Sequence, residues 1–121
     1  MYKIILYKDK NNKCDIQEHL MNLQEKKDKD SRIIFNKINA YINLLSEYGL
    51  DLGKPYIKFI EDGIWELRPV RDRILFACLE DNTFILLSMF VKQTQKTPKR
   101  EIEKAKRLLK DFEKRSGNSE K

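Results

Sequence analysis

Three arginines, Arg68, Arg71 and Arg73, lie within six residues in the segment IWELRPVRDRILF. The segment is predicted to form two strands joined by a turn over PVRD. Since successive side chains of a strand point to opposite faces, Glu66, Arg68 and Arg73 are expected to share one face of the sheet. Guanidinium groups in such an array can bind a phosphate bidentately. The alternative is an exposed, charged sheet face that only resists edge aggregation.

Other kinds of catalytic site find little support in the sequence. His19 is the one histidine and lies far along the chain from the arginines, so a two-histidine ribonuclease mechanism is excluded. We expect it at the surface or at a helix cap. The sequence contains no glycine-rich phosphate loop, HExxH motif or carboxylate cluster with metal-ligand spacing, and neither a metal nor a cofactor is expected. Electrostatic catalysis and simple anion binding remain as the functions that the arginines could serve.

An array of arginine and lysine side chains could act on RNA without a metal. When a 2′-hydroxyl attacks its own 3′-phosphate, cations can neutralise the pentacovalent transition state and help the 5′-oxygen to leave. Such a site also needs precise positioning and one group that accepts the proton.

The net charge of +6 is concentrated near the C-terminus, where residues 92–121 hold 11 basic and 5 acidic side chains. This distribution indicates a polyanionic partner, either nucleic acid or an acidic protein, or else a lysine-rich surface that aids solubility. No run of about 18 apolar residues and no signal peptide occurs, so we expect a cytoplasmic protein with no membrane partner. Cys14 and Cys78 share no metal-site spacing and are expected to be reduced thiols.

The elements that must position the arginines follow an α+β pattern. A first strand is predicted at YKIILYKD, and apolar spacing predicts helices from 15 to about 27 and from the KKDKDS break to Gly49. A loop with the short edge strand YIKFI precedes an antiparallel meander of IWELRPV, RDRILFACLE and TFILLSMFVK. A final helix follows, with Thr97 as its N-cap and Pro98 as its first residue.

These elements predict one domain over residues 1–115 and a disordered tail over residues 116–121. The helices are expected to cover the sheet face that carries Trp65, Leu67, Ile74 and Phe76. The face with the arginines would then be open to solvent.

The segment GIWELRPVRDRILF, followed by FVKQTQKTPKREIEKAKRLLKDF, resembles the HigB-type toxins of the phage-derived branch of the RelE/ParE superfamily. The resemblance is strongest over residues 55–112. It implies a RelE-like fold, in which a small antiparallel sheet is flanked by an N-terminal helical hairpin and a C-terminal helix. It also implies the toxin of a type II toxin–antitoxin pair, a ribosome-dependent, metal-independent endoribonuclease that cuts mRNA and inhibits translation.

The resemblance also implies roles for single residues. Arg68 and Arg73 match basic positions on adjacent strands, and Lys92 matches one at the end of the last strand. RelE-type relatives carry lysines on the strand that here bears Glu66, and a tyrosine in the final helix region with no evident equivalent. The proton acceptor is therefore open between Glu66, Lys92 and Lys96. The cations expected to bind RNA around this centre are Arg71, Lys96, Lys99, Arg100, Lys54 and Lys58.

The implied partners are a HigA-type helix-turn-helix antitoxin, the ribosome and mRNA. Two other function classes stay open. A ParE-like toxin would poison DNA gyrase by protein binding alone, and a non-toxic module would bind nucleic acid with the same scaffold and basic face. The fold cannot separate these classes, but the arginine cluster favours the nuclease.

Overall fold

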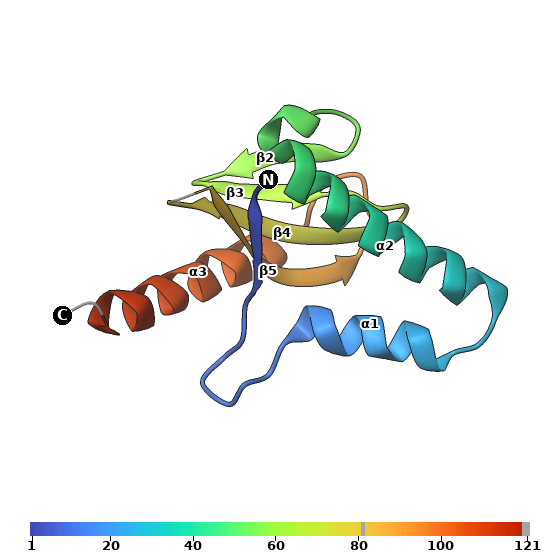
Figure 1. The fold of residues 1–121 in the computed structure, drawn as a ribbon, viewed down its shortest axis with the longest axis horizontal. Helices are drawn as coiled ribbons and strands as arrows, with labels where there is room; N and C mark the ends of the chain where they lie inside the picture. Colours follow the sequence, from blue (N-terminus) through green and yellow to red (C-terminus); the bar gives the residue numbers. More distant parts are fainter. Residues whose placement is uncertain (81, 120–121) are drawn as a thin grey trace.

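A five-stranded mixed sheet forms the centre of the protein (Figure 1), in a computed structural model that describes residues 1–80 and 82–119. The strand order is β1-β5-β4-β3-β2, so β2 is an edge strand as predicted. The three strands β3, β4 and β5 form the predicted antiparallel meander. The strands are β1 (Lys3–Leu6), β2 (Ile57–Glu61), β3 (Ile64–Leu67), β4 (Asp72–Leu79) and β5 (Thr83–Val91).

The sheet is not fully antiparallel, because β1 pairs with β5 in parallel. A parallel pair needs a long connection, and here that connection contains two helices and three strands. The predicted α+β class with a small RelE-like arrangement is confirmed, whereas the expectation of an all-antiparallel sheet is wrong for this pair.

An N-terminal helical hairpin consists of α1 (Asp15–Glu25) and α2 (Lys29–Tyr48), and a short 3₁₀ turn, η1 (Gly49–Leu52), follows it. The Asp28 carboxylate caps α2 by accepting a hydrogen bond from the Ser31 backbone N–H at 3.0 Å. Gly49 ends α2 with a φ of 61°, a left-handed conformation that favours glycine.

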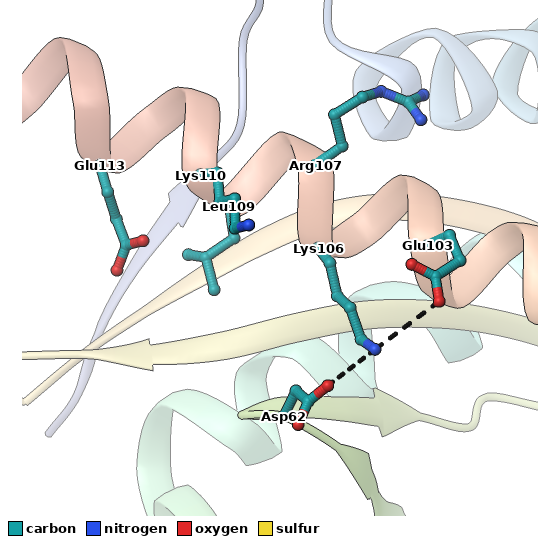
Figure 2. A pocket seen from close by; sticks show the side chains of 7 residues that line it. All are labelled: Asp62, Glu103, Lys106, Arg107, Leu109, Lys110 and Glu113. Atoms are coloured by element: carbon teal, nitrogen blue, oxygen red, sulfur yellow. Dashed lines mark ion pairs between the residues drawn. The ribbon is translucent and has the colours of Figure 1, made fainter.

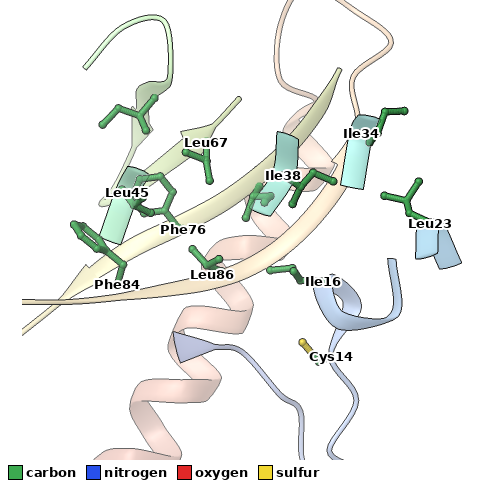
Figure 3. Close-up of a cluster of buried hydrophobic side chains, with 12 residues drawn as sticks. Cys14, Ile16, Leu23, Ile34, Ile38, Leu45, Leu67, Phe76, Phe84 and Leu86 are labelled. Atoms are coloured by element: carbon green, nitrogen blue, oxygen red, sulfur yellow. The ribbon is translucent and has the colours of Figure 1, made fainter. Parts of the chain in front are cut away.

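The hairpin covers one face of the sheet and encloses the larger core (Figure 3). Leu67, Ile74 and Phe76 point into this core, and Trp65 packs against it, as strand alternation predicts. They meet Ile38 and other apolar side chains of the two helices, which are Ile16, Leu23, Ile34 and Leu45.

α3 (Lys99–Ser119) covers the apolar part of the opposite face, so the expectation that this whole face is open is wrong. Leu75 and Ala77 alternate with the residues of the first core and pack with Ala105 of α3. Further apolar side chains of this second core are Ile64, Ile85 and Leu87. Because this face is apolar over most of its length, burying it under the apolar stripe of α3 is favourable.

The start and end of α3 also differ from the prediction. The Pro98 carbonyl accepts hydrogen bonds from the N–H groups of Glu101 and Ile102, at 3.0 and 3.2 Å, so Pro98 lies just outside the helix. Thr97 is not the N-cap, because α3 begins two residues later at Lys99, and the Thr97 hydroxyl donates to Glu66. α3 is assigned as far as Ser119, and the disordered tail expected over residues 116–121 stays a prediction. Residues 120 and 121 lie outside the described residues.

Two further properties concern cysteines and membranes. Both cysteines are free thiols, with Cys14 buried and Cys78 exposed. Over the described part of the chain, none of the helices combines the length and the apolar character of a membrane span.

Candidate phosphate-binding site

Glu66 of β3 lies at the centre of a cluster of cations and is almost fully buried, with 1% of its surface exposed. Its Oε1 atom is 3.6 Å from Nε of Arg68 and 3.9 Å from Nε of Arg73. Its Oε2 atom accepts a hydrogen bond of 2.5 Å from the Thr97 hydroxyl. Lys58 of β2 is the cross-strand partner of Glu66 in the sheet register. The predicted trio of Glu66, Arg68 and Arg73 is therefore brought together.

Arg73 is held firmly in this cluster and is only 8% exposed. Its Nη1 atom donates hydrogen bonds to the carbonyls of Val70, at 3.0 Å, and Asp72, at 2.8 Å. Val70 has a φ of 52°, which a β-branched residue rarely adopts, so Arg73 also stabilises a strained turn. Burial lowers the pKa of the Arg73 guanidinium, and the attraction of Glu66 opposes that shift.

Lys92 follows β5 and belongs to the same cluster. Its backbone N–H donates to the Arg71 carbonyl at 2.9 Å, which extends the pairing of β4 and β5 by one step. Burial lowers the pKa of the Lys92 ammonium group, and repulsion from Arg73 and Arg68 acts in the same direction. A partly buried lysine beside two arginines gains charge neutralisation when an anion binds.

An open groove lies beside this cluster and is lined by Arg71, Arg73, Lys92 and the neighbouring turn residues Val70, Gln93, Thr94 and Gln95. Its three cations come from the turn between β3 and β4, the start of β4 and the end of β5. The groove is therefore suited to an anion that bridges two strands.

The remaining predicted RNA-binding residues lie around the cluster and not in it. Lys96, Lys99 and Arg100 line a second groove at the start of α3, which also includes Phe90. Lys58 is exposed on the edge strand, and Lys54 is exposed in the loop before it.

The decisive comparison is with protein families. A model of the family described as phage derived protein Gp49-like (DUF891) matches residues 24–110, well over half of the chain. The chain belongs to this Gp49-like family. The family is part of the RelE/ParE-like toxin superfamily, which places this chain in a toxin–antitoxin context. No similar sequence was found among curated proteins.

Two contacts of this Gp49-like chain could not be predicted from its sequence. Thr97 meets Glu66 from 31 residues away, and no local pattern marks that hydrogen bond. Nε2 of His19 lies 3.1 Å from Oδ1 of Asp72, from 53 residues away. Asp72 is buried and directly precedes Arg73 in the sequence, but its side chain lies on the sheet face that the helical hairpin covers. The histidine is thus a partly buried partner of a carboxylate, not a surface or cap residue, and it does not point at the arginines.

Some cations of α3 differ from those of the cluster, because they do not share their acidic partners with a second cation. Nζ of Lys106 is 2.8 Å from Asp62 and 3.7 Å from Glu103 (Figure 2). It also pairs with Glu61. Lys104 pairs with Asp15 at 2.9 Å. Part of the positive charge of α3 is therefore compensated within the protein.

Proposed function

We propose that this Gp49-like chain is a HigB-type toxin of a type II toxin–antitoxin pair that cleaves mRNA on the ribosome. The observation that carries the proposal is the convergence of Arg68 and Arg73 on one buried carboxylate, at 3.6 and 3.9 Å, next to a groove lined by Lys92. Two guanidinium groups and an ammonium group can neutralise a phosphate that gains charge in the transition state.

The proposed reaction is an internal transfer at phosphorus. The 2′-oxygen forms a bond to the adjacent phosphorus, the bond from phosphorus to the 5′-oxygen breaks, and a 2′,3′-cyclic phosphate and a 5′-hydroxyl result. One proton leaves the 2′-hydroxyl and one reaches the 5′-oxygen. Arg68 and Arg73 would bind the non-bridging oxygens, so the transition state is stabilised more than the ground state.

Lys92 is the best candidate for proton transfer among the three residues left open by the sequence. Glu66 is 1% exposed and hydrogen bonded to Thr97, so its carboxylate cannot reach a ribose. Lys96 lines the second groove, beyond the arginines. Lys92 lines the arginine groove, and its lowered pKa makes its ammonium group a better proton donor to the departing 5′-oxygen.

The proposed partners follow from this role. A helix-turn-helix antitoxin of the HigA type would neutralise the toxin, and mRNA on the cytoplasmic ribosome would be its substrate. The exposed residues Lys58, Lys96, Lys99 and Arg100, with Arg71 and Lys54, would attract the RNA backbone.

Expression of the wild-type chain in growing bacteria tests this proposal. We expect growth arrest, together with new mRNA 5′ ends that appear in translated regions by primer extension. Growth arrest with intact mRNA and inhibited gyrase supercoiling would instead show a ParE-like toxin. Normal growth with RNA binding only would show a non-toxic binding module.

A further inference from the structure

Glu66 is a buried acidic residue that the proposed reaction does not use. Its Oε1 atom and Nε of Arg73 are both buried, and among the described residues neither has a hydrogen-bond partner. The two atoms are 3.9 Å apart, an ion pair without a direct hydrogen bond. A buried carboxylate is costly unless it is paired, so the charges of the two arginines are what make this position tolerable.

The carboxylate meets both arginines at the same part of the guanidinium group. Oε1 of Glu66 lies nearest to Nε of Arg68 and of Arg73, and Nη1 of Arg73 is held by two backbone carbonyls. The side chain of Arg68 is 27% exposed, against 10% for that of Arg73. Glu66 thus lies behind the two arginines, on the side away from solvent.

The second carboxylate oxygen binds a different part of the site. Oε2 of Glu66 accepts the hydrogen bond of Thr97, the last residue of the segment 92–97 between β5 and Pro98. Lys92 begins this segment, and Lys96 is next to Thr97. One carboxylate therefore connects Arg68, which follows β3, and Arg73 of β4 to the segment that carries the lysines.

We infer that Glu66 is a positioning residue, which orients Arg68 and Arg73 from behind and fixes the lysine-bearing segment through Thr97 so that these cations converge on one phosphate. The inference rests on the proposed function for its kinetic test, but not for its structural test. Glu66 itself would touch neither RNA nor the reacting atoms.

Replacing Glu66 with Gln distinguishes the positioning of the arginines from their electrostatic attraction for RNA. The amide keeps the size and a hydrogen-bond acceptor for Thr97, but it removes the negative charge beside the arginines. RNA would then bind at least as tightly, because the local positive charge increases. Cleavage would slow by about a hundredfold, the usual effect of a small misplacement of catalytic groups.

The kinetic experiment compares wild type, Glu66→Gln, Thr97→Val and Glu61→Gln on ribosomes programmed with mRNA. Single-turnover cleavage gives the rate constant at saturation and the concentration for half-maximal rate, and thermal unfolding shows that each variant is folded. Glu61→Gln is the matched control, because Glu61 is exposed and pairs with Lys106, away from the cluster. We expect Glu66→Gln, and more weakly Thr97→Val, to lower the rate constant without raising the half-saturation concentration.

The structural experiment needs no activity. In ¹⁵N-resolved NMR spectra, the Nε–H groups of Arg68 and Arg73 should give distinct signals at the same positions in wild type and in Glu61→Gln, and these signals should shift in Glu66→Gln. If wild type cuts no RNA but the signals change as described, the proposed function fails and the positioning role stands. An unchanged rate constant in folded Glu66→Gln, or unchanged arginine signals, would overturn the inference.

Discussion

The cation cluster at the sheet and the outer surface of α3 use positive charge in opposite ways. On α3, Lys106 has three acidic partners, Glu61, Asp62 and Glu103. In the cluster, Arg68 and Arg73 share the single carboxylate of Glu66, and Lys92 lies beside them. The cluster therefore keeps an excess of positive charge next to an open groove, whereas the charge of Lys106 on the helix is already compensated.

This difference shows that charge counted along the chain does not locate an anion site. The last thirty residues carry 11 basic and 5 acidic side chains, so their net charge equals that of the whole protein. Yet the cations that line the open groove beside Glu66, which are Arg71, Arg73 and Lys92, come from the turn before β4, from β4 and from the end of β5, and only Lys92 belongs to those thirty residues. Exposed ion pairs contribute little to stability, so the pairs on α3 mostly remove charge from the surface.

The largest expected effect is that of Arg73→Ala. Loss of one donor to a developing oxyanion lowers the rate by about 10²- to 10³-fold, or about 3 kcal/mol, so growth arrest should be relieved. Growth on induction and mRNA cleavage measure the effect.

Because Arg73 also holds the carbonyls of Val70 and Asp72, the variant can lose stability as well. Thermal unfolding and the milder Arg73→Lys substitution provide the control. A folded Arg73→Ala protein that still cuts mRNA at the wild-type rate would show that this arginine has no catalytic role.

A smaller effect is expected from the double substitution Lys99→Ala and Arg100→Ala. These residues line the second groove and would contact phosphates without taking part in the reaction. The rate at saturation should be unchanged, while the slope of log affinity against log salt should fall by about 1 for each lost contact. Binding to ribosomes over a salt series measures the slope, and an unchanged slope would remove these two residues from the interface.

The smallest effect concerns the far end of α3, where the Tyr7 hydroxyl donates to Asp111 at 2.5 Å. This hydrogen bond lowers the pKa of Asp111. The pKa of Tyr7 is raised, mainly by burial and secondly by its hydrogen bond to Asp111. The carboxylate contribution is present above the ordinary carboxyl pKa of about 4 and is lost as the pH falls through the lowered pKa of Asp111. The tyrosine contribution is present below about pH 10 and is lost as the pH rises through the raised pKa of Tyr7.

Tyr7→Phe should therefore lower the unfolding temperature most between these two limits, with no effect on cleavage. Unfolding curves at pH 3, 7 and 10.5 test this. A difference from wild type that is the same at all three values would contradict the assignment.

Local sequence patterns were sufficient to predict much of the fold and to predict that Glu66, Arg68 and Arg73 lie together. Alternation within β3 and β4 placed Arg68 and Arg73 on the face of Glu66, opposite Leu67 and Ile74. Each of these assignments depends only on the alternation of side chains along one strand, which the geometry of the strand fixes.

Long-range contacts could not be obtained in this way. The apolar stripe of α3 predicts that the helix packs against an apolar surface. It does not show that this surface is the sheet face around Leu75 and Ala77. The register shift between β4 and β5 near Leu75 and Phe76 interrupts simple alternation in β5. The hydrogen bonds from Thr97 to Glu66 and from His19 to Asp72 join distant segments, so tertiary packing alone creates them.

The most direct test of the central claim compares Arg68→Ala with Lys106→Ala in the same cleavage assay. Arg68 is a cation of the cluster with 27% of its side chain exposed, and Lys106 is a compensated cation of α3. Primer extension on mRNA from induced cells should show the wild-type cuts with Lys106→Ala and their loss with Arg68→Ala. Persistent cuts with Arg68→Ala, or their loss with Lys106→Ala alone, would contradict the assignment of the active site to the sheet arginines.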